Sequence, residues 1–181
     1  MKICIIGTHS TGKTTLVNAL ADFYKKLGKK TITISEISRM CPYPINEDSN
    51  IDAQKWILRE QMKYEDMSHQ QDTWVFCDRG TIDNFAYLER TSGDTDISEI
   101  KKHAVGHMKT YDLVFKTVKL HKPAEDDGVR SIDDGFRNDI DHRVVRLLDE
   151  CGIEHILLPE SLEVKVHVEF IVNIILQAQL G

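Results

Sequence analysis

The sequence predicts an α/β fold in which a parallel sheet of five strands carries helices on both faces. Five short apolar runs are spread along the 181 residues and have the length of strands. Longer segments with apolar residues at helical spacing lie between several of these runs. Strands that alternate with helices favour parallel pairing, because a parallel connection needs a crossover, which is usually a helix.

The elements follow in order along the chain. The predicted strands are residues 2–6, 31–35, 74–77, 113–116 and 155–158, and the predicted helices are residues 14–27, 52–70, 135–150 and 162–180. In the first helix Leu16, Leu20 and Phe23 share one face, and Gly28 is placed to end it. Residues 162–180 begin with the alternation of apolar and polar residues typical of a strand. We assign them to a helix because the strand before them must be covered by a helix packed on the sheet.

Two polar segments interrupt this pattern. Residues 41–50 contain two prolines and are predicted to form a loop. Residues 121–134 are rich in Asp, Gly and Pro around Arg130, and a polar loop of this length is often a lid. We therefore expect a single domain over residues 1–181 with a short lid at about residues 121–137.

Composition narrows the class of protein. The net charge of −6 and the pI of about 5.7 give no general attraction to nucleic acids or membranes. The first apolar run is too short for a signal peptide, and residues 170–176 are too short to span a bilayer. Cys4, Cys41, Cys77 and Cys151 form no CxxC pair and no zinc spacing, which favours a reducing, cytoplasmic location.

The segment from Gly7 to Thr14, GTHSTGKT, fits the P-loop pattern G-x-x-x-x-G-K-[ST]. The glycines let the backbone N–H groups converge on a phosphate, and the helix that follows points its positive end at the same anion. Lys13 can reach the outer phosphates, and Thr14 can offer its hydroxyl to Mg²⁺. The pattern predicts a nucleoside triphosphate and magnesium as cofactors. The residues expected to hold the nucleotide are Gly7, Ser10, Thr11, Gly12, Lys13, Thr14 and Thr15.

His9 occupies a variable position of this pattern. It can either touch a phosphate or face solvent, and we expect it to face solvent.

Asp78 and Arg79 close the third predicted strand. If that strand lies beside the first, Asp78 is near the phosphates and can hold Mg²⁺ through water. The alternative for Asp78 is a helix N-cap. A ring ATPase would usually carry Asp-Glu here, and a small GTPase would carry Asn-Lys-x-Asp; neither motif is present. Arginine beside a metal carboxylate suits binding of an acceptor or of a transferring phosphate.

Together these segments resemble a known family. The stretches GTHSTGKTT, SEISR, FCDRG and DDGVRSIDDGFRNDIDHRVVRLLDECGI are similar to the P-loop kinase-like domain in the ribosylnicotinamide kinase part of NadR proteins and in related AAA-type bacterial and phage P-loop NTPases. The resemblance covers nearly the whole chain, and the layout is more remotely similar to deoxynucleoside and thymidylate kinases. It implies a three-layer α/β/α P-loop NTPase fold, ATP with Mg²⁺, and phosphoryl transfer to a small hydroxyl or phosphate acceptor.

The resemblance also implies roles at the acceptor. Glu36 matches the acidic residue that faces the acceptor, Arg39 matches its companion arginine, and Asp78 with Arg79 matches an Asp-Arg pair. For Glu36 the residue itself agrees, because a carboxylate at the carboxyl edge of a strand beside the P-loop strand faces the ligand crevice and can orient or deprotonate a hydroxyl. The alternative is a surface glutamate or a helix cap. Tyr43 can stack on an acceptor ring or only pack its loop.

The lid residues are assigned in the same way. Asp126, Asp127, Gly128 and Arg130 match the lid loop of the family, with Asp127 at the acceptor, and Arg137 lies on the helix that follows. Arg130 and Arg137 can neutralise charge on the transferred phosphoryl group, or can form ordinary salt bridges with nearby aspartates. The candidate catalytic residues are Lys13, Glu36, Asp78, Arg79, Arg130 and Arg137.

Three functions are compatible with these features. The first is an ATP- and magnesium-dependent kinase of a small nucleoside, ribosyl compound or nucleotide. The second is a nucleotide-dependent switch with a protein partner, which the missing guanine motif and missing glutamate disfavour. The third is a kinase of a nucleic-acid-linked hydroxyl, which the acidic balance disfavours, since the one basic cluster is residues 25–30. The sequence leaves open the acceptor, the choice between ATP and GTP, and whether the chain forms a homodimer.

Overall fold

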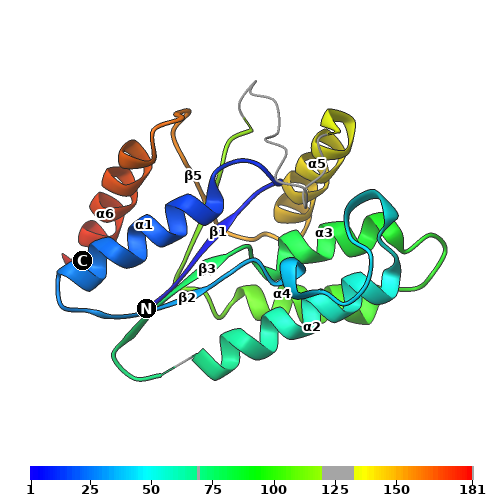
Figure 1. Ribbon diagram of the computed structural model, residues 1–181, viewed down its shortest axis with the longest axis horizontal. Helices are drawn as coiled ribbons and strands as arrows, with labels where there is room; N and C mark the ends of the chain where they lie inside the picture. Colours follow the sequence, from blue (N-terminus) through cyan, green and yellow to red (C-terminus); the bar gives the residue numbers. More distant parts are fainter. Residues whose placement is uncertain (69, 120–132, 181) are drawn as a thin grey trace.

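The computed structural model describes residues 1–68, 70–119 and 133–180. A five-stranded parallel sheet, in the order β2-β3-β1-β4-β5, runs through the centre of the molecule (Figure 1). The strands are β1 (Lys2–Ile6), β2 (Lys30–Ile34), β3 (Thr73–Asp78), β4 (Leu113–Lys116) and β5 (Ile156–Leu157). The helices are α1 (Lys13–Lys26), α2 (Ile51–Ser68), α3 (Thr81–Thr91), α4 (Ser98–Met108), α5 (Asp134–Glu150) and α6 (Val164–Leu180), with the 3₁₀ turns η1 (Ile37–Met40) and η2 (Asn46–Asp48).

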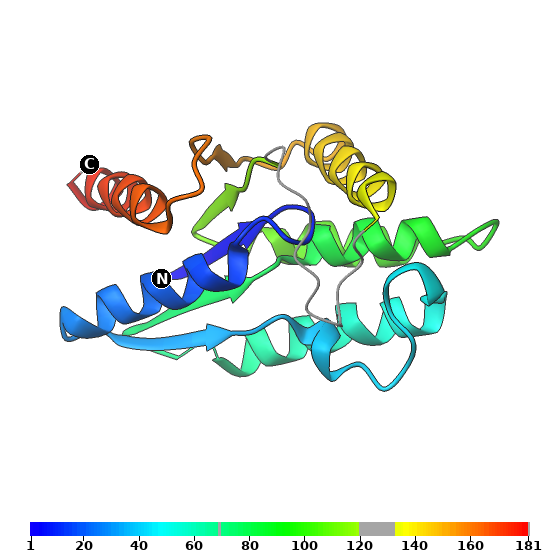
Figure 2. The same cartoon turned by 45° about the horizontal axis from the view of Figure 1, so that its top comes forward.

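Helices cover both faces of the sheet, as predicted. Helices α1 and α6 lie on one face, and α2, α3, α4 and α5 lie on the other; Figure 2 shows α2 and α3 side by side on that second face. The central strand β1 serves both layers because successive side chains of a strand point to opposite faces. Ile3 and Ile5 pack with α1 and α6, whereas Cys4 and Ile6 pack with the other four helices.

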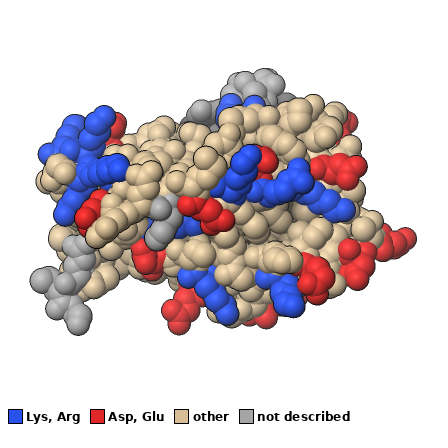
Figure 3. Space-filling model, turned by 90° about the horizontal axis from the view of Figure 1, so that it is seen from below, with Lys and Arg blue, Asp and Glu red and all other residues tan. Residues whose placement is uncertain are grey.

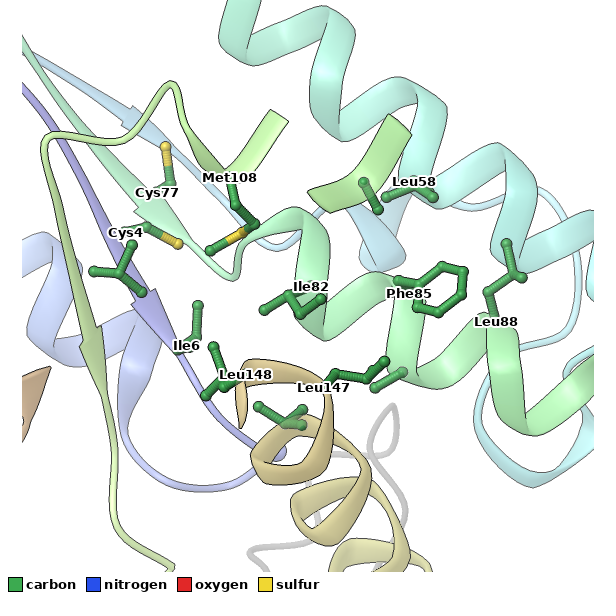
Figure 4. Close-up of a cluster of buried hydrophobic side chains, with 14 of the residues drawn as sticks. Cys4, Ile6, Leu58, Cys77, Ile82, Phe85, Leu88, Met108, Leu147 and Leu148 are labelled. Carbon is green, nitrogen blue, oxygen red and sulfur yellow. The ribbon is translucent and has the colours of Figure 1, made fainter. Parts of the chain in front are cut away.

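The larger of the two cores lies beneath the four-helix face (Figure 4). Cys4 and Cys77, which are partners in the β1–β3 register, meet Ile82 and Phe85 of α3 and Leu147 and Leu148 of α5 there. Both cysteines are free and fully buried, and burial raises the pKa of each thiol well above its usual value. They therefore act as small apolar core residues, as expected.

Most predicted elements are confirmed within one or two residues. All five strands are present, and the ambiguous C-terminal segment is helix α6. Two helices were not predicted: α3 and α4 occupy a segment to which the sequence analysis gave no element. A second prediction was wrong, because β2 pairs with β3 and not with the P-loop strand β1. Glu36 therefore lies one strand further from the phosphate loop than expected.

The sheet order places the candidate site at one edge. The phosphate loop follows β1, Glu36 follows β2, and Asp78 and Arg79 end β3, so all of them emerge from the carboxyl ends of neighbouring parallel strands. Strands β2 and β3 lie on one side of β1, and β4 and β5 lie on the other, so the strand order reverses at β1. Ligands of open α/β sheets bind at the carboxyl ends of the strands where the order reverses.

Charges of both signs are spread over the surface. Figure 3 shows exposed Lys and Arg side chains gathered at the end of the molecule where α1 gives way to β2, and mixed with acidic residues elsewhere on that face. The gathered residues include Lys25, Lys26, Lys29 and Lys30. No helix in the described ranges is long and apolar enough to cross a membrane.

Candidate active site

The phosphate loop joins β1 to α1 and is shaped by left-handed backbone. Gly7, Ser10 and Gly12 have φ values of 134°, 56° and 81°, and α1 begins directly afterwards at Lys13. A Cβ atom at Gly7 would lie 2.2 Å from Thr117 Oγ1, so only glycine fits where the loop passes β4. The loop thus combines turned backbone with a helix N-terminus, the arrangement that binds phosphate.

Lys13 is held inside this loop. Its side chain is buried, and Nζ donates to the Thr8 carbonyl at 2.5 Å. Burial, together with the nearby Arg79 cation, lowers the pKa of Lys13 to about 8. An anion in the loop would reverse this effect, because opposite charge favours the ammonium form.

Thr14 and Asp78 meet between α1 and β3. Thr14 Oγ1 donates to Asp78 Oδ2 at 2.5 Å, and the β1–β3 register that aligns Ile5 with Asp78 brings the two side chains together. A hydroxyl beside a carboxylate is a donor set that suits a hard cation such as Mg²⁺. The described residues contain no group of three His, Cys, Asp or Glu side chains that could hold a metal, so phosphate oxygens or water would complete any such site.

Glu36 and Arg79 form a buried ion pair. Arg79 Nε and Nη2 donate to Glu36 Oε1 at 2.9 and 2.7 Å, and both side chains are only 6% exposed. Arg39 approaches the second oxygen, with Nε 3.4 Å from Glu36 Oε2. The structure thus brings Glu36, Arg39 and Arg79 together, and the two arginines orient the carboxylate.

A second buried carboxyl group ties the phosphate loop to α3. Asp83 accepts from the Gly7 N–H at 3.1 Å and from the Gly80 N–H at 3.4 Å, and it is completely buried. Burial raises the pKa of Asp83 to about 6, although Arg79 and Lys13 act in the opposite direction. Asp83 therefore fixes the first glycine of the loop relative to the Asp78–Arg79 segment.

A pocket opens beside the Glu36–Arg79 pair. It is lined by His9, Glu36, Ser38, Ile45, Asn46, Gln54, Ile57, Arg79, Asn84 and Tyr87. Two donors in its wall, Arg79 Nη1 and Asn84 Nδ2, are buried and have no hydrogen-bond partner among the described residues. Buried donors are nearly always paired, so this wall is suited to a ligand that brings hydrogen-bond acceptors.

His9 does not face solvent, and this expectation was wrong. It is 3% exposed, its Nδ1 lies 3.1 Å from the Tyr87 hydroxyl, and its ring packs against Phe136 at 5.4 Å between centroids. Tyr87 belongs to α3, which the sequence analysis did not predict, and Phe136 belongs to α5. These two helices cover the loop and turn His9 into part of the pocket wall.

The remaining predicted site residues differ in burial and in their distance from the pocket. Arg137 is 1% exposed and its carbonyl accepts from Thr8 Oγ1 at 3.1 Å, so the start of α5 is fastened to the phosphate loop. Arg137 Nη1 also lies 3.3 Å from Asp134 Oδ1. This is one of the ordinary salt bridges that were the alternative to a role of Arg137 at the phosphoryl group. Tyr43 is 47% exposed and does not line the pocket described above, and Thr15 is exposed. The predicted lid residues Asp126, Asp127, Gly128 and Arg130 lie outside the described residues.

Comparison with solved structures supports this fold. The crystal structure of NadR protein in complex with NR matches with a TM-score of 0.69 and 18% identity, over 90% of this chain and 46% of that chain. Deoxyadenosine kinase from M. mycoides, with products dCMP and dCDP bound, matches with a TM-score of 0.68 and 18% identity, over 98% of this chain and 100% of that chain. Thymidylate kinase from Ehrlichia chaffeensis matches with a TM-score of 0.67 and 17% identity, over 96% and 98%.

The chain spans about half the length of the NadR protein and the full length of the kinase from M. mycoides. No curated protein matches it by sequence. A family model described as an AAA domain (AAA_28) matches residues 2–165, which is most of the chain. The phosphate loop, the parallel sheet and this match agree: the chain belongs to the AAA_28 family of P-loop domains and has the fold of P-loop kinases.

Proposed function

We propose that the chain is an ATP- and magnesium-dependent phosphotransferase that phosphorylates a hydroxyl group of a small nucleoside or ribosyl compound. The observation that carries the proposal is the buried Glu36–Arg79 pair in a pocket wall at the sheet edge from which the phosphate loop also emerges. A donor site and an acceptor pocket side by side are what direct phosphoryl transfer requires.

The donor half uses the phosphate loop. The outer phosphates of ATP are bound by the loop N–H groups, the N-terminus of α1 and Lys13. The residues present fit that role because the backbone at Gly7, Ser10 and Gly12 has the left-handed turns that a phosphate-binding loop requires. Thr14 and Asp78 are the residues that would hold Mg²⁺. Bound magnesium would neutralise charge on the triphosphate oxygens and help to fix them.

The acceptor half uses the ion pair. Glu36 accepts a hydrogen bond from the acceptor hydroxyl and takes its proton as the oxygen bonds to the terminal phosphorus. The bond between that phosphorus and the oxygen bridging to the β-phosphate breaks, and ADP leaves. Arg79 orients Glu36 through two hydrogen bonds. A carboxylate in the pocket wall favours a hydroxyl as the accepting group, because a hydroxyl must lose a proton when it attacks, whereas an ionised phosphate need not.

The chemistry of the remaining pocket residues suits a nucleoside or riboside. Ile45, Ile57 and Tyr87 supply apolar surface. Asn84 Nδ2 and Arg79 Nη1 can donate hydrogen bonds to acceptor atoms of the ligand, such as ring nitrogens or sugar oxygens. Arg130 and Arg137 complete the proposal by neutralising charge on the transferring phosphoryl group, with Asp127 contributing to the acceptor site. The matched structures contain NR in one case and the products dCMP and dCDP in the other, which supports an acceptor of the nucleoside or nucleotide class.

The test is a search for the product. Purified protein is incubated with Mg-ATP and with pools of nucleosides, nucleoside monophosphates and nicotinamide riboside, while ADP release is followed and products are identified by mass spectrometry. Lys13→Ala is the inactive variant, and Lys25→Ala on the exposed end of α1 is its matched control. We expect a phosphorylated nucleoside or riboside with wild type and Lys25→Ala, and none with Lys13→Ala.

Two results would contradict the proposal. A product formed only from monophosphates would show that the acceptor is a phosphate, against the argument from Glu36. ATP hydrolysis that no acceptor stimulates would favour a nucleotide-dependent switch with a protein partner.

A further inference from the structure

Arg79 holds an unusual backbone conformation. Its φ is 80°, in the left-handed region that residues other than glycine rarely adopt. Such strained residues persist only where the surroundings hold them, and they concentrate at functional sites. Two hydrogen bonds fix this backbone: the Arg79 N–H donates to the Ile5 carbonyl at 3.1 Å, and the Arg79 carbonyl accepts from Gln61 Nε2 at 3.3 Å.

Gln61 reaches Arg79 from α2 and is completely buried. The same Nε2 donates to Glu65 Oε1 at 2.5 Å, one helical turn along. Glu65 is itself fixed, because its Oε1 accepts from the Tyr111 hydroxyl at 2.9 Å and its Oε2 lies 2.6 Å from Lys2 Nζ.

The orientation of the Gln61 amide follows from its neighbours. A carboxylate and a carbonyl can only accept hydrogen bonds, so both need the NH₂ end of the amide. The reverse orientation would set the amide oxygen against two acceptors. Gln61 therefore connects a rigid buried ion pair to the backbone that carries the Arg79 guanidinium.

We propose that Gln61 is a positioning residue that holds Arg79 in its left-handed conformation and thereby aims the guanidinium at Glu36. This inference rests on the proposed function, since Gln61 does not line the pocket and acts on the acceptor only through Arg79. The competing explanation is that Gln61 merely satisfies a buried polar network and contributes to stability alone.

The test compares two variants of the same network. Gln61→Met keeps the length of the side chain and removes both donors, whereas Tyr111→Phe removes a different donor to Glu65 and does not touch Arg79. The free energy of unfolding, the kcat and KM for the acceptor, and the KM for ATP are measured for both. We expect both variants to lose stability, but only Gln61→Met to lose tenfold or more in acceptor kcat/KM, with the KM for ATP within twofold of wild type.

A second readout does not depend on turnover. The hydrogen bond to Glu36 protects the Arg79 Nε–H proton from exchange with water. The NMR signal of this proton can be assigned because it is absent in Arg79→Lys. We expect this proton to exchange with water at least tenfold faster in Gln61→Met and at an unchanged rate in Tyr111→Phe. If Gln61→Met does not fold, Gln61→Asn, whose amide is one methylene too short, carries the same comparison.

The outcomes separate the two proposals. Equal effects of Gln61→Met and Tyr111→Phe on exchange and on kcat/KM would overturn the positioning role and leave the kinase function standing. Faster exchange in Gln61→Met, in a protein that phosphorylates no acceptor, would support the positioning role and contradict the kinase function.

Discussion

The molecule contains two buried ion pairs of similar geometry and different surroundings. Lys2 and Glu65 are 2.6 Å apart with side chains 4% and 0% exposed, and Arg79 and Glu36 are 2.7 Å apart with both side chains 6% exposed. In the first pair the protein supplies further partners, since Lys2 Nζ also donates to Thr110 and lies over the Tyr111 ring. In the second, Arg79 Nη1 has no partner in the described part of the chain.

The comparison shows that burial and charge alone do not mark an active site. Both pairs are buried, and a buried ion pair is common in structural networks as well. The difference is that Glu36 and Arg79 line the pocket, whereas Lys2 and Glu65 do not. A place in the wall of a pocket is therefore the more specific signal.

The largest expected effect is on turnover at the pocket pair. Glu36→Gln removes the proton acceptor but retains an oxygen for Arg79, so we expect acceptor-dependent turnover to fall by about 10²–10⁴-fold. The loss in free energy of unfolding should be smaller than that of the same substitution at Glu65. Steady-state kinetics and urea denaturation of the two variants check this prediction. Near wild-type turnover by Glu36→Gln would remove Glu36 from the mechanism.

The enclosed pair should show the reverse pattern. Glu65→Gln leaves Lys2 buried without its countercharge, and we expect a loss of roughly 3–5 kcal/mol in the free energy of unfolding. Among molecules that remain folded at low temperature, acceptor turnover should fall far less than in Glu36→Gln. A stable, inactive Glu65→Gln variant would show that the two pairs are not separable in this way.

Asp83 provides a pH test of the connection between the loop and α3. Its pKa is raised to about 6 from an unfolded value of 3.8, so the native state binds this proton more tightly than the unfolded chain does. The stability that this proton contributes is present below about pH 4 and is lost as the pH rises through about 6. We expect wild type to lose roughly 1–3 kcal/mol over this range relative to Asp83→Asn, measured by urea denaturation at several pH values. Parallel pH profiles of the two proteins would contradict it.

The smallest effect is expected at an exposed pair. Arg146 is 43% exposed and bonds Glu150 at 3.0 Å, and it also pairs with Glu89 of α3. Exposed pairs contribute about 0.2–1 kcal/mol, so Arg146→Ala should change the free energy of unfolding within that range and leave turnover unchanged. A larger loss, or one that persists in 1 M salt, would show that the surface network matters more than its exposure suggests.

The sequence predicts features whose residues are contiguous. The phosphate loop is one segment of eight residues, from Gly7 to Thr14, and the strands are short apolar runs, so local patterns were sufficient. Helices α3 and α4 were missed although Ile82, Phe85 and Leu88 are spaced as on a helix face, and Asp83 supplies an N-terminal signal.

The pocket could not be predicted in the same way. Gln54, Asn84 and Tyr87 come from two helices and meet His9 only because of the sheet order and the packing of α3 beside α2. The third strand was expected beside the first, which the β1–β3 pairing confirms. The position of β2 beyond β3 was not predicted, because alternating strands and helices do not specify the order of strands in a sheet. Arg79 and Glu36 were identified as individual residues, but no local pattern indicates the bond between them or the left-handed Arg79 backbone.

The most direct test of the central claim follows the terminal phosphoryl group of ATP. Wild type and Glu36→Gln are incubated with Mg²⁺, [γ-³²P]ATP and the acceptor identified from the pools, and the label is traced to acceptor or to inorganic phosphate. We predict that wild type places the label on the acceptor hydroxyl and that Glu36→Gln does so at least a hundredfold more slowly. Label found only in inorganic phosphate, with or without acceptor, would contradict the assignment of the Glu36–Arg79 pocket as an acceptor site.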